Sequence, residues 1–294
     1  MRYTLRQLEV FLATARYGNV SRAAHSLAMS QSAASGALKE LETQFEVLLF
    51  DRIGKRLQLS ELGIQLRPQA ENLLEQATAF EQSMRGDQIS GRLHIGATLT
   101  IGNYLAVAMI ARFREQFPDA DVAMSVANTA SIAEQVARFE LDMGLIEGDY
   151  QHPDLLIEQW RSDELVVFAA PDHPLATGRP ISDSRLVTLP WIVRERGSGT
   201  RQTFDRAMHG LLPQLNIAME LQHTEAIKRA VEAGLGVGCL SRISLTEALQ
   251  RGSLVALPVT HRDFSRQLYT ITHRKKFHSA TLDQWLQLCR ATSP

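Results

Sequence analysis

Residues 5–59 read LRQLEVFLATARYGNVSRAAHSLAMSQSAASGALKELETQFEVLLFDRIGKRLQL, and this stretch decides how the N-terminal part of the chain folds. A capping-box pattern starts a first helix, whose apolar residues recur at helical spacing until Gly18. Asn19 or Ser21 caps a short second helix, and Ser30 caps a third. The second and third helices are joined by about three residues, which is the spacing of a helix-turn-helix.

A small hairpin and a long helix follow these three helices. Residues 49–53 and 56–59 are β-rich runs joined by Gly54-Lys55, which predicts a hairpin wing. A helix is expected over 61–85, although Pro68 inside it removes one backbone hydrogen bond. The apolar residues of this helix are spaced 4, 3, 4, 3 and 4, as in the seam of a coiled coil: Leu66, Ala70, Leu73, Ala77, Phe80 and Met84.

The rest of the chain alternates between strands and helices, after a short linker at Gly86-Asp87-Gln88 and Ser90-Gly91. Such alternation predicts an α/β domain with mainly parallel sheets, and its length favours two lobes. The expected strands are 92–96, 122–127, 143–146, 156–160, 165–170, 191–193, 218–222, 236–240 and 267–272. The expected helices are near 101–116, 131–139, 200–209, 224–233, 243–250 and 279–290.

Charge is distributed unevenly along the 294 residues, although the formal net charge is only −1. Residues 1–60 hold eight basic and five acidic side chains, a net charge of +3, so the remainder carries −4. A basic N-terminal part suits contact with nucleic acid. Cys239 and Cys289 lack the spacing of a zinc site, and we expect both to be packing residues. The sequence has no membrane-spanning run and no signal-peptide core, so we expect a cytoplasmic protein.

The predicted third helix has an apolar stripe and an opposite polar face. Gln can pair with adenine, Ser with base edges or phosphate, and Lys with phosphate or guanine. Small residues at Ala33 and Gly36 would let this face lie deep in a major groove. The alternative is that any small three-helix unit has a polar outer face, as in protein–protein modules. The candidate DNA-binding residues are Ser21, Arg22, Ser30, Gln31, Ser32, Ser35, Lys39, Arg52, Lys55 and Arg56.

The segments AAHSLAMSQSAAS, LKELE and LLFDR resemble the N-terminal signature of LysR-type transcriptional regulators. The resemblance implies an all-α winged helix-turn-helix with a linker helix, followed by a two-lobed α/β effector domain like periplasmic binding proteins. It also implies double-stranded DNA with a palindromic site, a small-molecule effector and RNA polymerase as partners, in a homodimer or dimer of dimers. Ser32 departs from the family, which often has Pro there, but serine fits a first helical turn.

The same resemblance sets the expected domain boundaries. The winged helix-turn-helix covers 1–60, and the dimerising linker helix and hinge cover 61–90. The effector domain covers 91–294. Its lobe I is expected at about 91–161 and 268–294, and its lobe II at about 162–267.

Three loops that join an expected strand to a helix are candidate parts of an effector pocket: 96–103, 194–201 and 223–225. Ligands of α/β domains bind beyond the carboxyl ends of strands, and the free N–H groups of a helix N-terminus suit an anion. The alternative is that the hydroxyl side chains there are only helix caps. The family resemblance places the pocket at these loops, and the candidate effector-binding residues are Thr98, Thr100, Asn103, Asn128, Glu147, Arg194, Ser198, Thr200 and Thr224.

Glu147 ends an expected strand at the same level as these loops. Its carboxylate would repel a doubly charged anion, and it fits better with a protonated oxyanion or with a cationic partner. Arg194, Arg196 and Arg201 are the candidates for that partner. The alternative is that Glu147 is a solvated residue at the end of a strand.

A narrower resemblance concerns the segments GATLTIGNYL, WIVRERGSGTR and MELQHTEAIKRAVEAGLGVGCLSR, which look like a YeiE-type subgroup of the LysR family. It implies a small sulfur oxyanion, sulfite first, as effector, and control of sulfur or related redox genes. We expect no metal, no catalytic residues and no other cofactor. Gly197-Ser198-Gly199 lacks the spacing of a nucleophile elbow, which disfavours an enzyme. A transporter's solute-binding protein leaves residues 1–85 unexplained.

Overall fold

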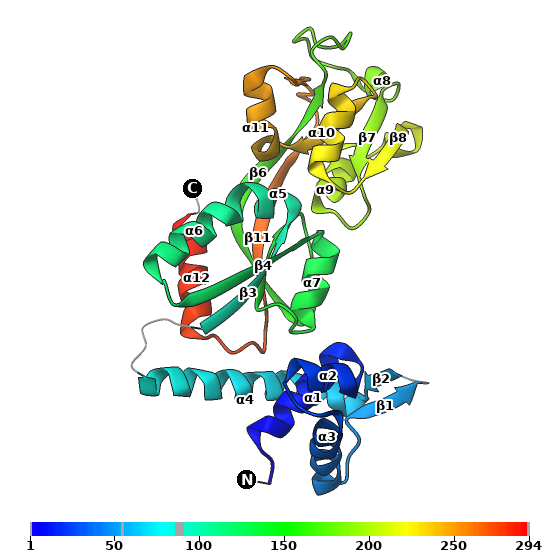
Figure 1. Ribbon diagram of the computed structural model, residues 1–294. Helices are drawn as coiled ribbons and strands as arrows, with labels where there is room; N and C mark the ends of the chain where they lie inside the picture. The colour runs from blue at the N-terminus through cyan, green and yellow to red at the C-terminus, as the bar shows by residue number, and fades with distance from the viewer. Residues whose placement is uncertain (1, 54–55, 86–90, 293–294) are drawn as a thin grey trace. The chain divides into compact units, whose positions relative to one another are not determined.

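The computed structural model describes residues 2–53, 56–85 and 91–292, and the chain divides into two compact units (Figure 1). The first unit comprises Met1–Gly91 and Arg274–Asp283. The second comprises Arg92–His273 and Gln284–Pro294. The predicted wing turn at 54–55, with candidate Lys55, and most of the predicted linker lie outside the described residues.

The first unit contains the predicted helices, hairpin and long helix. Thr4 forms the capping box with Gln7, and the N-cap of the second helix is Asn19, whose Oδ1 accepts a hydrogen bond from Arg22 N at 3.0 Å. Ser30 caps the third helix, and Gly18 ends the first at φ 59°. The elements are α1 (Leu5–Tyr17), α2 (Val20–Ser26), α3 (Gln31–Phe45), β1 (Phe50–Ile53), β2 (Arg56–Leu59) and α4 (Glu61–Arg85).

The core of the first unit joins α1 and α3 to the hairpin. Phe11 and Phe50 meet edge to face, with ring centroids 5.7 Å apart, and Leu38 and Leu41 are buried beside them. Burial of this apolar face supplies most of the stability of such short helices. α4 is continuous through Pro68, although the proline cannot donate a backbone hydrogen bond.

The second unit is built on strands that run through two lobes. Lobe I contains β3–β5 and lobe II contains β7–β10, and Figure 1 shows β6 and β11 running through both. The strand order is β4-β3-β5-β11-β6-β9-β7-β8, with β10 paired to β6. The strands are β3 (Gly91–Thr98), β4 (Ala120–Ala127), β5 (Met143–Glu147), β6 (Leu155–Ala169), β7 (Pro190–Arg194), β8 (Asn216–Leu221), β9 (Val237–Ser241), β10 (Val255–Ala256) and β11 (Ser265–His273).

Two predictions about these strands are wrong. The segments expected as separate strands at 156–160 and 165–170 form the single strand β6, because it continues from one lobe into the other. The sheet is mixed rather than mainly parallel. β3–β5, β7–β8 and β7–β9 are parallel pairs, whereas the crossover strands β6 and β11 are antiparallel to each other, and each also pairs antiparallel with a lobe strand.

Helices flank these strands at the predicted places. The helix predicted at 101–116 is divided into α5, a π-helical turn (Gly102–Ala106) and α6. The short helix α8, a 3-10 turn (Leu212–Gln214) and β10 were not predicted. The helices are α5 (Leu99–Ile101), α6 (Val107–Gln116), α7 (Thr129–Ala137), α8 (Asp183–Leu186), α9 (Gly199–Ala207), α10 (Thr224–Glu232), α11 (Arg242–Arg251) and α12 (Ala280–Ala291).

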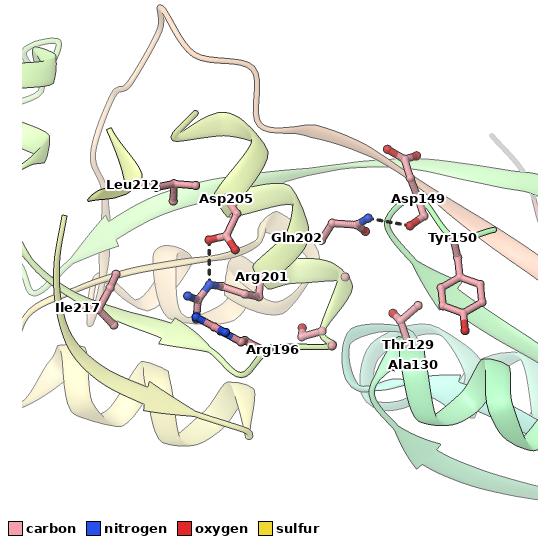
Figure 2. A pocket seen from close by; sticks show the side chains of 13 residues that line it. Thr129, Ala130, Asp149, Tyr150, Arg196, Arg201, Gln202, Asp205, Leu212 and Ile217 are labelled. Atoms are coloured by element: carbon pink, nitrogen blue, oxygen red, sulfur yellow. Dashed lines mark hydrogen bonds and ion pairs between the residues drawn. The ribbon is translucent and has the colours of Figure 1, made fainter. Parts of the chain in front are cut away.

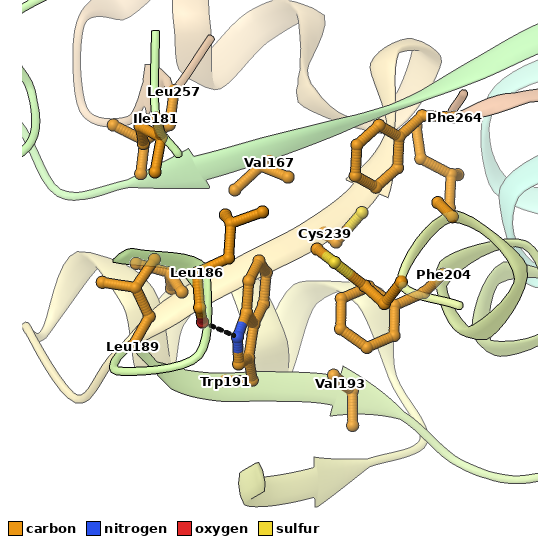
Figure 3. Packing of buried hydrophobic residues seen from close by; sticks show 14 of the residues in the cluster. Val167, Ile181, Leu186, Leu189, Trp191, Val193, Phe204, Cys239, Leu257 and Phe264 are labelled. Carbon is orange, nitrogen blue, oxygen red and sulfur yellow. Dashed lines mark hydrogen bonds between the residues drawn. The ribbon is translucent and has the colours of Figure 1, made fainter. Parts of the chain in front are cut away.

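The core of lobe II packs around Trp191 (Figure 3). Its ring meets Phe204 edge to face at 5.0 Å, and its Nε1 donates to Leu186 O at 2.9 Å. Cys239 lies in this cluster, and burial raises the pKa of its thiol. Cys239 and Cys289 are both buried and free. Among the described residues, no helix combines the length and apolarity needed to cross a bilayer.

Candidate functional site

The candidate DNA-binding residues form an exposed polar surface on the first unit. Ala34, Leu38 and Leu41 of α3 are buried against α1 and α2, so the opposite face of α3 is left to solvent. Every described candidate is exposed: Ser21, Arg22, Ser30, Gln31, Ser32, Ser35, Lys39, Arg52 and Arg56.

This polar surface has no projecting side chain at Gly36. A Cβ atom added at Gly36 would meet nothing within 4 Å. The Ser30 hydroxyl accepts from Ala33 N at 3.2 Å and lies 3.1 Å from the Ser32 hydroxyl, so these two serines are partly held by each other. The side chains of Gln31, Ser35 and Lys39 are exposed on the same face.

A second polar site lies inside the other unit, around the carboxylate of Glu147. Glu147 ends β5 and is only 2 % exposed, which excludes the solvated strand-end interpretation. Its Oε1 accepts from the Thr98 hydroxyl at 2.7 Å and from Thr100 N at 3.1 Å. Its Oε2 accepts from the Thr200 hydroxyl at 3.0 Å. Lobe I supplies Thr98 and Thr100 and lobe II supplies Thr200, so one carboxylate is bound by both lobes.

The cation beside Glu147 is Arg266, from the crossover strand β11. Its Nη1 donates to Glu147 Oε2 at 2.6 Å and to the Thr200 hydroxyl at 3.0 Å. Its Nε donates to Asp163 Oδ2 at 2.7 Å, and Asp163 Oδ1 accepts from the Ser241 hydroxyl at 2.9 Å. All of these side chains are buried, so the ions are held by each other rather than by water. We call Glu147, Arg266 and Asp163 the ion cluster.

The protonation state of Glu147 follows from these contacts. Burial alone would raise the pKa of its carboxyl, but the Arg266 guanidinium and the hydrogen bonds from Thr98 and Thr100 outweigh it and lower the pKa from 4.5 to about 2. Both oxygens of Asp163 accept hydrogen bonds from donors, as a carboxylate requires. The ion cluster therefore contains two carboxylates and one guanidinium.

Two glycines allow the lobes to approach each other closely beside Glu147. A Cβ atom on Gly199, at the start of α9, would lie 1.9 Å from Glu147 O. Gly148 has φ 79°, and a Cβ atom there would meet Gly199 Cα at 3.0 Å. The Thr129 hydroxyl donates to the same Glu147 O at 2.9 Å. Gly199 thus allows close backbone contact between the lobes.

Within the described residues, three further predicted effector residues make no hydrogen bond to the Glu147 side chain: Asn128, Arg194 and Asn103. Asn128 caps α7 through Ser131 N at 3.0 Å. Arg194 is buried but paired with Glu195 at 2.8 Å, and Arg201 is bound by Asp205 and Glu220. Arg196 is exposed, so none of the three candidate arginines is the hydrogen-bonded partner of Glu147. Asn103 is exposed on the π-helical turn, outside the contacts made by Glu147.

The interpretation of the hydroxyl side chains as helix caps does not hold for most of them. Within the described parts of the chain, neither Thr98 nor Ser198 makes a side-chain cap hydrogen bond, although each is an N-cap residue. The hydroxyls of Thr98 and Thr200 instead donate to Glu147. Thr224 is 2 % exposed, and its hydroxyl has no hydrogen-bond partner among the described residues.

Arg266, Asp163 and Ser241 are residues that sequence reasoning missed. Asp163 and Arg266 are charged residues in or beside runs that were read as strands, which was the available signal. That signal could not identify their partners, because Arg266 and Glu147 are separated by 119 positions in the chain.

A cavity of about 670 Å³ opens between the lobes (Figure 2). Thr129, Asp149 and Tyr150 line it from lobe I, and Arg196 and Gln202 line it from lobe II. Gln202 Nε2 donates to Asp149 O at 2.8 Å, which connects the lobes at the edge of the cavity.

A separate contact joins the lobes through Tyr104 of the π-helical turn. Its hydroxyl donates to Glu225 Oε1 of α10 at 2.7 Å, and Lys228 Nζ donates to the same oxygen at 2.6 Å. Burial and the bond to Glu225 raise the pKa of the Tyr104 phenol, so it remains a donor at neutral pH.

Comparison with known proteins identifies both parts of the chain. Residues 5–64 match the bacterial regulatory helix-turn-helix protein, lysR family, and residues 86–294 match the LysR substrate binding domain. The Escherichia coli (strain K12) protein described as an uncharacterized HTH-type transcriptional regulator, YeiE, is 46% identical over 289 residues, which cover 98% of each chain.

Solved structures show the same fold. Full-length OxyR from Pseudomonas aeruginosa has a TM-score of 0.76 at 22% identity, covering 99% of this chain and 94% of that one. The regulatory domain of CcmR from Synechocystis, solved in complex with 2-PG, has a TM-score of 0.63 at 26% identity, covering 70% of this chain and 100% of that one.

The matches to the two family domains together cover nearly the whole chain, and they coincide with the exposed polar face of α3 and with the two-lobed α/β unit. This protein belongs to the LysR family of transcriptional regulators.

Proposed function

We propose that this LysR-type regulator binds a palindromic DNA site through α3 and the wing, and that a small oxyanion between the lobes controls how it does so. The observation that carries the proposal is the convergence of donors from both lobes on one carboxylate, Glu147. A site that draws its donors from two lobes is sensitive to how the lobes are closed. An anion that interacts differently with two closure states shifts their populations.

The DNA-binding part of the proposal rests on the exposed face of α3. Gln31 and Ser35 would contact base edges in a major groove, and Lys39, Arg52 and Arg56 would contact phosphates. Phosphate contacts make affinity depend on salt, with a slope of about 0.9 per phosphate neutralised. The proposed location is the cytoplasm, where DNA and RNA polymerase are accessible.

The test is a salt titration of DNA binding by fluorescence anisotropy. Lys39→Ala and Arg56→Ala should each weaken binding and reduce the slope of log affinity against log salt by about 0.9. Arg112→Ala, an exposed arginine of α6, is the matched control and should change neither quantity. Slopes that equal the wild-type slope for both variants would reject the DNA surface.

Dimerisation through α4 completes the proposed DNA-binding form. Leu73, Phe80 and Met84 of the predicted seam are 40%, 64% and 66% exposed in the single chain. An apolar groove of about 480 Å³, lined by residues of α1, α3 and α4 such as Phe45 and Leu62, opens in the same unit. A second copy of α4 would cover this apolar surface and place two α3 helices on successive half-sites, and pairs of dimers would extend the contact.

For the effector we propose a small sulfur oxyanion, with sulfite first. The donors around Glu147 are hydroxyls, a backbone N–H and a guanidinium, which are the groups that bind oxyanions. The related regulatory domain of CcmR was solved with a small molecule, 2-PG, which supports a small-molecule site in this fold. Control of sulfur or related redox genes would follow from such an effector.

A thermal-shift panel of sulfite, other small anions and amino-acid precursors, with DNA binding measured for each hit, tests the effector. Thr98→Val with Thr200→Val removes two hydroxyl donors and should abolish the response while leaving basal DNA binding intact. Thr100→Ala is a weaker choice, because Thr100 contributes its backbone N–H. Thr246→Val, an exposed threonine of α11, is the control. A response only to an uncharged organic ligand would reject the oxyanion.

A further inference from the structure

The first strand of the wing is fixed to the helices of the first unit at the residue that precedes it, Leu49. The N–H of Leu49 donates to Glu42 Oε1 of α3 at 2.7 Å, and its carbonyl accepts from Ser60 N at 3.0 Å. Leu49 is buried, so both of its backbone groups need partners within the protein. A Cβ atom on Gly63 of α4 would lie 2.2 Å from Leu49 O, so α4 begins in direct contact with the same residue. The end of α3, the start of the wing and the start of α4 therefore meet at Leu49.

The second strand of the wing is fixed to the end of α1. Leu57 N donates to Gly18 O at 3.0 Å, and Gly18 ends α1. In the register of the hairpin Leu57 lies opposite Arg52, and Arg56 directly precedes Leu57, so both exposed wing arginines lie next to this contact. An isolated two-stranded hairpin is marginally stable at best, and each strand here has only four residues. The contacts at Leu49 and Leu57 therefore determine how the wing is held.

The contact from Glu42 differs from the others because a charged side chain of α3 makes it. A carboxylate acceptor gives a charge-assisted hydrogen bond, which is roughly twice as strong as a neutral one. Glu42 follows Lys39 by three positions, a spacing at which opposite charges on a helix commonly pair. Among the described residues no ion pair joins these two side chains, and Glu42 binds the Leu49 N–H instead. Lys39 is thereby left exposed on the outer face of α3.

We propose that Glu42 is a positioning residue for DNA binding: its bond to Leu49 sets the wing relative to α3, so that Lys39 and the wing arginines reach phosphates of one duplex together. This inference rests on the proposed function, because it names the side chain that orders the proposed DNA surface. Without the bond, the wing keeps its contact with Gly18, but its first strand is no longer fixed to α3. Arg52 and Arg56 would then lose their defined positions over the phosphates, and with them the contacts that orient the protein on DNA.

The experiment is a salt titration of DNA binding by the full chain, followed by fluorescence anisotropy. The probe is a mixed-sequence duplex of about 40 base pairs, because phosphate contacts need no particular sequence. Glu42→Ala removes the acceptor, and the slope of log affinity against log salt should fall by about 1.8, the value for two phosphate contacts. The ratio of wild-type to variant affinity should then be about tenfold larger at about 50 mM salt than at about 200 mM.

Two further variants separate positioning from charge and from stability. Glu42→Gln removes the same negative charge but keeps an oxygen acceptor for the Leu49 N–H, so it should retain the wild-type slope. In a protein that already carries Arg52→Ala and Arg56→Ala, Glu42→Ala should change the slope no further, because the contacts it positions are absent. A role confined to stability predicts instead a lower melting temperature with an unchanged slope for the folded protein.

The possible outcomes distinguish this inference from the proposed DNA surface. If the two arginine substitutions lower the slope and Glu42→Ala does not, the positioning role is overturned and the DNA surface stands. If none of these variants changes the slope, both are overturned. A Glu42→Gln protein with the slope of Glu42→Ala would show that the charge matters rather than the hydrogen bond, which also overturns the inference. If Glu42→Ala does not fold, Glu42→Asp gives the same test, because its shorter side chain withdraws the acceptor from Leu49 and keeps the charge.

Discussion

The outer face of α3 and the ion cluster use polar side chains in opposite ways. On α3, Gln31, Ser35 and Lys39 are exposed and available for an outside partner. In the ion cluster, Glu147 and Arg266 are buried and bind each other and four further groups from several elements. The first surface presents its polar groups to solvent, where a partner from outside the protein can reach them. In the second, both oxygens of Glu147 already accept hydrogen bonds from residues of the protein, so a ligand must compete with contacts that already exist.

This difference predicts a large gap between the stability effects of charge removal at buried and at exposed positions. Arg266→Met leaves Glu147 and Asp163 buried without their cation, which should lower the free energy of unfolding by about 3–5 kcal/mol. Arg242→Met is the control, because its pair with Glu164 is half exposed and should be worth at most about 1 kcal/mol. Urea denaturation followed by circular dichroism measures both, and equal losses would contradict the comparison.

The same contrast explains which features the sequence revealed. The caps at Thr4, Asn19 and Ser30 and the exposed face of α3 follow from residues a few positions apart, so local patterns predicted them. The continuous strand β6 and the mixed sheet depend on pairing between distant segments, and the local pattern misread them.

The candidate effector site was predicted in part for the same reason. Thr98, Glu147 and Thr200 follow strands whose carboxyl ends meet, so a topology rule brought them together. Arg266 approaches from β11, a crossover strand whose register with β5 no local pattern specifies. The cation was expected among the arginines of 194–201 because that loop was expected at the same pocket, whereas the ion-pair partner is Arg266.

A second prediction concerns acid stability. The pKa of Glu147 is about 2 in the folded protein, whereas a glutamate without these partners has a pKa of 4.5. The ionised form of Glu147 therefore stabilises the fold above pH 4.5. That contribution is lost as the pH falls from 4.5 through about 2. Over this window the wild-type protein should lose up to about 3 kcal/mol more stability than Glu147→Gln, which cannot titrate there.

Acid titration of the unfolding free energy, measured by urea denaturation at each pH, tests this window. Asp149→Asn serves as the control, because its exposed carboxylate has no comparable set of buried donors. If wild type and Glu147→Gln lose stability in parallel, Glu147 is not the buried carboxylate that makes the fold sensitive to acid.

The smallest predicted effect tests the exposed face of α3. Gly36→Ala is expected to raise the stability of the free protein and to lower its affinity for DNA. Gly36→Ala replaces glycine in a helix interior, where alanine is favoured by about 1 kcal/mol, and the new methyl group meets nothing within 4 Å. The free protein should therefore become more stable by about that amount. If this face enters a major groove, the methyl group takes space that DNA needs, and DNA affinity should fall. Thr246→Ala on α11 is the control: it should raise the stability slightly and leave the DNA affinity unchanged. A Gly36→Ala protein that is more stable and binds DNA as tightly as wild type would show that this face does not lie against the bases.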